Sequence, residues 1–244
     1  MFKKIILTAL LLTITISVNA QDLWGNTKKI KGNGKIVTVS RTTSNYDEVS
    51  VGGSFDVILI KGKESKITIE GEENIIPFIE TEVNGATLDV KHKKRVNLRT
   101  TKRPRVTITY KNIDKVSLGG SGNIKSEGTI KSNDFHVSLS GSGNITLIVD
   151  ADEISSNIGG SGNIELSGTS KKFTCSIAGS GSIKAYELDT DILNANIAGS
   201  GRIKATVSTQ IKAKVVGSGH IYYKGNPKYV DSKSVGSGSV IGEN

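Results

Sequence analysis

The chain has 244 residues, of which 36% are hydrophobic and 5% aromatic, and its formal net charge is +9. One Trp and five Phe supply few large side chains for a thick globular core, and a lone cysteine excludes an intrachain disulfide. A thin interior filled by Ile, Val, Leu and Ala fits this composition, so we expect one elongated unit or two closely joined ones.

The first twenty residues have the pattern of a secretory signal peptide. Two lysines precede an apolar run from Ile5 to Val18, and the small residues up to Ala20 suit cleavage before Gln21. The run is too short to anchor the chain in a membrane once it is cut, and no cysteine follows the cleavage site to carry a lipid. We therefore expect residues 1–20 to be removed and the mature protein, without a transmembrane span, to be exported to the periplasm, the outer surface or the medium.

Residues 21–115 are predicted to form an irregular β region that is continuous with the repeats after it. Alternating apolar residues predict strands, and Pro77 favours a short helical turn near residues 74–79. The predicted strands span residues 35–39, 48–51, 55–60, 66–70, 87–91 and 105–110.

A segment from Lys91 to Arg105 contains eight basic residues and no acid. Removing Lys3 and Lys4 with the signal peptide leaves 30 basic against 23 acidic residues, so the mature chain has a net charge of +7 and this segment accounts for all of it. The basicity is therefore a local patch. Its basic residues are Lys91, Lys93, Lys94, Arg95, Arg99, Lys102, Arg103 and Arg105.

Two interpretations of this segment stand. The simpler one is a long solvated hairpin loop between strands 87–91 and 105–110, kept soluble by its charge. The functional one is electrostatic attachment to a polyanion such as lipopolysaccharide phosphate, acidic polysaccharide or extracellular DNA. Nucleic acid is disfavoured among these, because the run contains no aromatic residues for base stacking.

From residue 116 to residue 244 the chain repeats a Gly-Ser-Gly turn that is followed two positions later by a β-branched residue. The spacings between successive turns are 21, 19, 19, 20, 18 and 19 residues, and this period is typical of a solenoid. The first glycines of the seven turns are Gly120, Gly141, Gly160, Gly179, Gly199, Gly217 and Gly236.

The residues around each turn alternate with period two, which predicts a strand before it and another after it. Coils of about 19–20 residues are too short to contain a crossover helix, so the repeats predict an all-β fold, a parallel β-helix with glycine at the corners. The position four residues before each turn is small, and we place Cys175 in this core column. Its members are Val137, Ser156, Cys175, Ala195, Ala213 and Ser232.

The glycine motif fits no common cofactor or catalytic site. A calcium-binding β-roll needs an aspartate where Ile164 stands, a dinucleotide site needs a third glycine that opens a helix, and Ser121 lies directly between two glycines, unlike the serine of a hydrolase elbow. His92, His136 and His220 share no ligand spacing. We expect no cofactor, no metal ion and no catalytic residue.

A family resemblance rests on Gly52-Gly53-Ser54-Phe55-Asp56-Val57 together with the Gly-Ser-Gly-Asn-Ile series. The chain resembles the bacterial family called putative auto-transporter adhesin, head GIN domain, which is common in Bacteroidota. The resemblance covers nearly all of the mature chain. It implies a β-helical protein of the cell envelope or medium, and it supplies no catalytic residues.

Two functions remain in view. The first is a structural or adhesive β-solenoid without catalysis, whose faces contact a glycan, lipopolysaccharide or a surface protein. The second is a carbohydrate-active β-helix enzyme, which needs carboxylates gathered in a groove. The acids at 150–153 and 189–191 lie at corresponding places two coils apart, and solvated connecting segments explain them, so we favour the first function.

Overall fold

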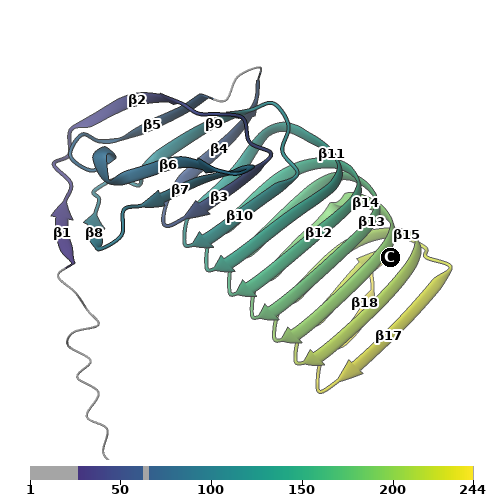
Figure 1. The fold of residues 1–244 in the computed structure, drawn as a ribbon. Coiled ribbons are helices and arrows are strands. Elements are labelled where there is room, and N and C mark those ends of the chain that lie inside the picture. The colour runs from purple at the N-terminus through teal and green to yellow at the C-terminus, as the bar shows by residue number, and fades with distance from the viewer. Residues whose placement is uncertain (1–26, 63–65, 244) are drawn as a thin grey trace, which may run out of the picture.

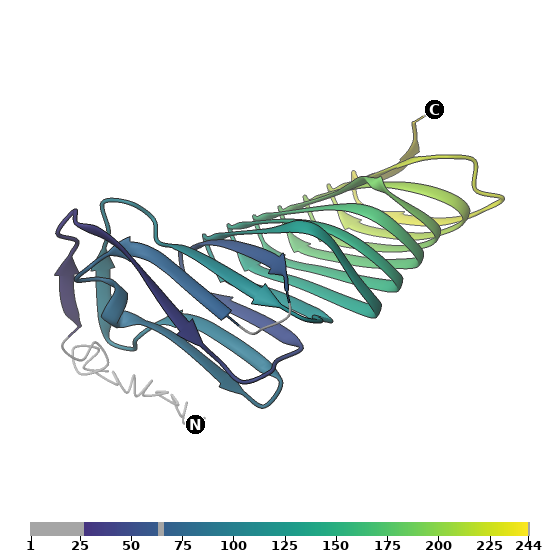
Figure 2. The same ribbon diagram turned by 90° about the horizontal axis from the view of Figure 1, so that it is seen from above.

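Two β-sheets face each other across a narrow core and wind together as a flattened solenoid (Figure 1, Figure 2). This computed structural model describes residues 27–62 and 66–243, so the predicted signal peptide lies outside the described residues. The strands before the repeats are β1 (Lys28–Lys31), β2 (Ile36–Thr42), β3 (Glu48–Gly52), β4 (Asp56–Lys61), β5 (Lys66–Glu72), β6 (Ile79–Asn84), β7 (Thr87–His92), β8 (Val96–Arg99) and β9 (Arg105–Tyr110).

The repeats form long strands that bend from one sheet into the other. We call the strands that lead into each Gly-Ser-Gly corner sheet 1 and the strands that follow it sheet 2. The strands of the repeats are β10 (Lys115–Gly120), β11 (Asn123–Gly141), β12 (Asn144–Gly160), β13 (Asn163–Gly179), β14 (Ser182–Gly199), β15 (Arg202–Gly217), β16 (His220–Lys224), β17 (Tyr229–Val235) and β18 (Ser239–Gly242).

Parallel pairing in register stacks equivalent residues of successive coils, which confirms the predicted β-solenoid. One inward column of sheet 2 is buried throughout and consists of Ile124, Ile145, Ile164, Ile183, Ile203 and Ile221. The small column of sheet 1 is also confirmed, and Cys175 lies fully buried between Ser156 and Ala195. Burial raises the pKa of the Cys175 thiol, as expected for an unreactive core residue.

The corners explain why each turn repeats its glycines. Gly160 has a φ of +129°, and a Cβ atom there would lie 2.5 Å from the carbonyl oxygen of Gly141 in the preceding coil. That oxygen accepts hydrogen bonds of 3.0 Å from the N–H groups of Ser161 and Gly162. Only glycine allows both the backbone conformation and this close stacking. The motif therefore builds the corner.

The N-terminal end is closed by antiparallel strands that the sequence pattern does not predict as such. β2 and β5 extend sheet 2 beyond β9, and β6 extends sheet 1 beyond β7. The expected helical turn is confirmed as one 3₁₀ turn, η1 (Ile76–Phe78), with Pro77 inside it. The closed end shields the core of the first coils from solvent.

The predicted hairpin loop between strands 87–91 and 105–110 is wrong. β7 pairs with β3 in sheet 1, whereas β9 pairs with β4 in sheet 2, so the two strands are not neighbours. The basic segment crosses from one sheet to the other, and it contains β8, which pairs in parallel with β1. A four-residue strand that pairs with a segment more than sixty residues away leaves too weak a pattern to be found from the sequence.

Candidate functional site

A basic surface at the N-terminal end of the protein is built from two segments that are distant in sequence. β1 and β8 form a separate two-stranded sheet at the N-terminal end (Figure 1), with Lys28 opposite Val96 and Lys31 opposite Arg99. We call β1, β8 and the turn residues 93–95 that precede β8 the basic sheet. No acid occurs in either segment.

The two faces of the basic sheet differ in character. Ile30, Val96 and Leu98 are half-buried, and the ammonium of Lys28 lies 5.7 Å from the centre of the Phe78 ring. The alternate residues point the other way and are exposed, because side chains alternate along a strand. Besides Lys28, which is also exposed, the exposed cations of the basic sheet are Lys29, Lys31, Lys93, Lys94, Arg95 and Arg99.

Half of the predicted polyanion-binding residues are already paired with acids. The ammonium of Lys102 lies 3.2 Å from the Glu70 carboxylate, and Arg103 lies 3.2 Å from that of Asp56. Contacts of 3.7 Å join Lys91 to Asp89 and Arg105 to Glu70. These four cations are therefore partly compensated.

The other predicted residues, Lys93, Lys94, Arg95 and Arg99, form no ion pair within the part of the chain that the structure describes. The structure brings them together with Lys29 and Lys31, which the sequence analysis did not assign to any site. A signal for these lysines was present, because residues 27–46 contain no acid. Their proximity depends on the pairing of β1 with β8, which the sequence does not reveal.

A buried carboxylate holds the loop after the basic sheet. Glu72, at the end of β5, accepts hydrogen bonds from the N–H of Gly34 and from the N–H and hydroxyl of Thr101. Burial raises the pKa of the Glu72 carboxyl, but these hydrogen bonds outweigh burial and leave the pKa below its usual value. Glu72 thus ties the chain that follows β1 and the chain that follows β8 to the same point.

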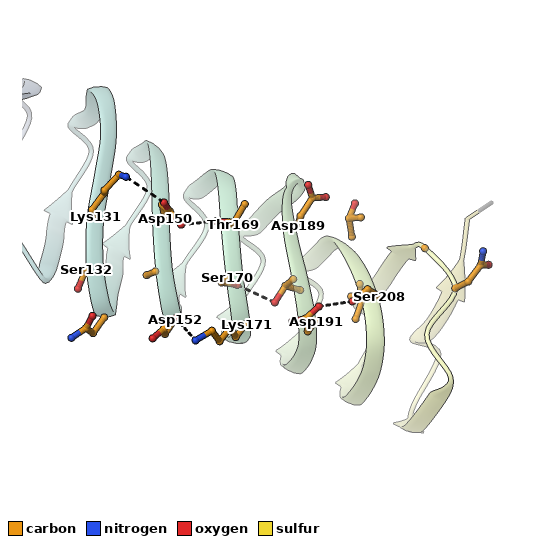
Figure 3. Close-up of a pocket in the computed structure, with 17 residues that line it drawn as sticks. Lys131, Ser132, Asp150, Asp152, Thr169, Ser170, Lys171, Asp189, Asp191 and Ser208 are labelled. Carbon is orange, nitrogen blue, oxygen red and sulfur yellow. Dashed lines mark hydrogen bonds and ion pairs between the residues drawn. The ribbon is translucent and has the colours of Figure 1, made fainter.

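A groove runs along the side of the solenoid opposite the Gly-Ser-Gly corners, with a volume of about 860 Å³. Figure 3 shows it lined by equivalent residues of successive coils, in rows parallel to the solenoid axis. The predicted correspondence of the two acidic segments is confirmed, since Asp150 and Asp189 both register with Thr169. The predicted loops are wrong here, because both segments lie within the continuous strands β12 and β14. The chain bends between the sheets without breaking the ladder.

Most of the groove carboxylates are engaged by the neighbouring coil (Figure 3). Asp150 accepts a hydrogen bond of 2.6 Å from the Thr169 hydroxyl and lies 3.9 Å from the ammonium of Lys131. The ammonium of Lys171 lies 2.8 Å from the Asp152 carboxylate, and its hydrogen bond to Asp152 raises the pKa of Lys171.

Further along the groove, Asp191 accepts a hydrogen bond of 2.7 Å from the Ser208 hydroxyl. Asp189 has no hydrogen bond or ion pair with any described residue. Contacts between coils therefore occupy three of the four aspartates.

The histidines form no common site. His92 packs edge-on against Phe55, with ring centroids 4.5 Å apart, and burial lowers the pKa of its imidazole. His220 accepts or donates a hydrogen bond of 2.8 Å with the Ser239 hydroxyl. Across residues 27–62 and 66–243, no three His, Cys, Asp or Glu side chains are grouped so that they could hold a metal ion.

The comparison with family models identifies the family of this chain. Residues 45–227 match the family described as putative auto-transporter adhesin, head GIN domain, and the chain belongs to it. A search of curated proteins gave no match. In the described part of the chain, no helix has the length and apolar character to cross a membrane.

Solved structures of similar proteins share the fold. A putative adhesin from Bacteroides fragilis has a TM-score of 0.84 at 24% identity, over 88% of this chain and 100% of its own. A putative lipid binding protein from Parabacteroides distasonis has a TM-score of 0.76 at 29% identity, over 89% and 100% of the two chains. A putative adhesin from Parabacteroides merdae has a TM-score of 0.72 at 26% identity, with the same coverage.

Proposed function

We propose that this protein is an exported, non-catalytic β-solenoid of the cell envelope that attaches to an anionic lipid surface through its basic sheet. The observation that carries this proposal is the gathering of six exposed cations, besides Lys28, from two acid-free segments in β1, β8 and the turn that precedes β8. The predicted signal peptide and the family description support an exported location.

The charge of the basic sheet is sufficient for reversible attachment. A Lys or Arg near an anionic membrane surface contributes about 1 kcal/mol. Six such residues give roughly 6 kcal/mol, which corresponds to a dissociation constant on the order of tens of micromolar. Salt weakens this attraction, because the cations are exposed and the Debye length at physiological ionic strength is about 8 Å.

The shape and composition of the basic sheet favour lipid phosphates as the partner. Its outer face is short and open, and its exposed side chains are Lys, Arg and Asn without an aromatic platform for bases. One relative of similar fold is described as a putative lipid binding protein. The same phosphate chemistry occurs in phospholipids and in lipopolysaccharide.

Vesicle binding tests the proposal and separates these two sources. The wild-type mature protein is expected to co-sediment with vesicles that contain phosphatidylglycerol or lipopolysaccharide, and not with phosphatidylcholine vesicles. Preference for one of the two anionic vesicles would identify the source of the phosphate. Equal binding to neutral vesicles would contradict the proposal.

Two variants with the same change in net charge locate the contact. The quadruple change of Lys29, Lys31, Arg95 and Arg99 to Ser should abolish binding. A matched control replaces four exposed lysines in β14, β15 and the loop before β17, and it should bind like the wild type. The control changes to Ser are at Lys184, Lys212, Lys214 and Lys228.

The groove supports a second candidate function, contact with a glycan. Its four aspartates and its row of hydroxyl groups offer many hydrogen-bonding partners along an axis that could accommodate an extended chain. Asp189, which has no partner among the described residues, is the residue to test. If the groove cleaves polysaccharide, release of reducing ends by the wild type should be lost in Asp189→Asn. If it only binds, a glycan array should give a signal without cleavage.

A further inference from the structure

The C-terminal end of the solenoid is open, unlike the N-terminal end. β17 pairs only with β15 and β18 pairs only with β16, so both have an outer edge without a strand partner among the described residues. Tyr229, Val230 and Val235 are 67%, 46% and 65% exposed. Unprotected edges with exposed apolar residues are sites of strand pairing between chains.

The orientation of the backbone shows which groups face the open edge of β17. In sheet 1 the outward-facing residues bond the preceding coil: the N–H of His136 donates a hydrogen bond of 2.8 Å to the carbonyl of Asp114. Asp231 is the equivalent of His136 in β17, so Asp231 and Lys233 bond β15. Backbone groups of successive residues in a strand point to opposite sides, so Val230, Ser232 and Ser234 direct their N–H and C=O groups to the open edge.

We propose that two copies of this chain associate tail to tail, with β17 of one copy pairing antiparallel to β17 of the other about Ser232. Such a pair is isologous, so each contact occurs twice. Asp231 lies opposite Lys233 of the second copy, and Tyr229 lies opposite its Val235. Ser232 lies opposite its own equivalent on the two-fold axis.

The sequence of β17 is self-complementary in this register. Asp231 and Lys233 are on the outer face, where the antiparallel pairing joins each acid to a base across the interface twice. The two most exposed apolar residues of the strand, Tyr229 and Val235, cover each other. Ser232 faces the open edge and pairs with its own equivalent at a hydrogen-bonded position, where Cα atoms are about 5.5 Å apart, and Val230 forms the flanking hydrogen-bonded pair with Ser234.

The two-fold axis of this dimer is also compatible with the position of β18 and with the inward-facing residues at the C-terminal end of the solenoid. An axis normal to both sheets keeps outward-facing side chains outward and places β18 beside β18 of the second copy. The inward residues Val230 and Ser234, which are exposed in one copy, become part of a continuous core. The basic sheets then lie at the two far ends of the dimer, because β1 and β8 are at the end of the molecule opposite β17 (Figure 1).

Charge reversal tests the register directly. In analytical ultracentrifugation the wild-type protein should form a dimer whose population rises with protein concentration. Asp231→Lys alone and Lys233→Asp alone each place like charges opposite each other, so each should shift the protein toward monomer. The double change, Asp231→Lys with Lys233→Asp, restores opposite charges and should restore the dimer.

Cross-linking gives a second readout that does not depend on affinity. Under oxidising conditions Ser232→Cys should form a disulfide-linked dimer, since the expected Cα separation falls within the disulfide range of 4.4–6.8 Å. Ser234→Cys is the control, because its equivalents are four residues out of register and should remain reduced. Cys175 is buried and does not compete.

A monomer at every concentration, single charge changes without effect, or equal cross-linking of both cysteine variants would overturn the proposal. Assemblies larger than a dimer would also overturn it, because they indicate head-to-tail stacking. These results are independent of the vesicle experiments, so either proposal can fail alone.

Discussion

The carboxylate of Glu72 accepts two hydrogen bonds of 3.0 Å from Thr101, one from its backbone N–H and one from its hydroxyl. Thr101 lies two residues after Arg99, the last residue of β8, and Glu72 also accepts a hydrogen bond of 2.8 Å from the N–H of Gly34. A buried anion therefore fixes the chain on both sides of the basic sheet. Without it, two backbone donors and a hydroxyl lose their partner.

This contact predicts a pH dependence of stability. The pKa of Glu72 in the folded protein is below its usual value of 4.5, because the hydrogen bonds to the charged form outweigh burial. Its contribution is fully present above about pH 4.5 and is lost as the pH falls through the folded pKa. Glu72→Gln should lower the free energy of unfolding at pH 7 by about 1–3 kcal/mol.

Thermal unfolding followed by circular dichroism between neutral and acidic pH measures this effect. The melting temperature of Glu72→Gln should depend less on pH than that of the wild type. Glu73→Gln is the control, since Glu73 is exposed and pairs with Lys35 at the surface. Identical pH profiles for wild type and Glu72→Gln would show that Glu72 does not control stability.

The corner geometry predicts that alanine substitutions at two adjacent glycines have very different effects on stability. Gly160→Ala introduces a Cβ atom 2.5 Å from the Gly141 carbonyl oxygen at a φ of +129°, and it should destabilise the protein by about 3 kcal/mol or more. Gly159→Ala should change stability by less than about 0.5 kcal/mol, because no atom lies within 4 Å of the added Cβ and Ala178 occupies the equivalent position in the next coil. Chemical denaturation compares the two, and equal losses would refute this explanation of the motif.

The narrow core predicts a strong size limit in the small column. Ala195 is fully buried beside Cys175, so Ala195→Phe should overpack the interior and cost about 1–3 kcal/mol or more. Cys175→Ala should cost less, because small residues already occupy the neighbouring coils. Titration with a thiol reagent gives an independent check: Cys175 should react at an appreciable rate only in denaturant, and fast reaction of the native protein would place it outside the core.

The repeats could be predicted because every coil contains the same pattern of a glycine turn flanked by alternating inward and outward residues. The column from Ile124 to Ile221 and the burial of Cys175 follow from a period of about 19 residues and alternation along strands. The open end could not be foreseen from the pattern, since Ser232 continues the small column but is exposed in β17. The repeat pattern predicts whether a side chain points into the core. It does not predict whether a further coil covers that side chain.

Only part of the candidate site could be predicted from the sequence. The charge of residues 91–105 was evident, but its division into paired and unpaired cations depends on acids such as Glu70 and Asp56, which belong to other strands. The contribution of Lys29 and Lys31 depends on the parallel pairing of β1 with β8. Such contacts between short, distant strands are set by the whole fold, not by local periodicity.

The most direct test asks which surface touches the membrane. An environment-sensitive fluorophore is attached at Asn97→Cys, on the exposed face of the basic sheet, or at Asn157→Cys, on the flat outer face of sheet 1. Addition of phosphatidylglycerol vesicles should shift the emission of the label at position 97 and leave the label at position 157 unchanged, and added salt should reverse the shift. A shift at position 157 that equals or exceeds the shift at position 97 would contradict attachment through the basic sheet.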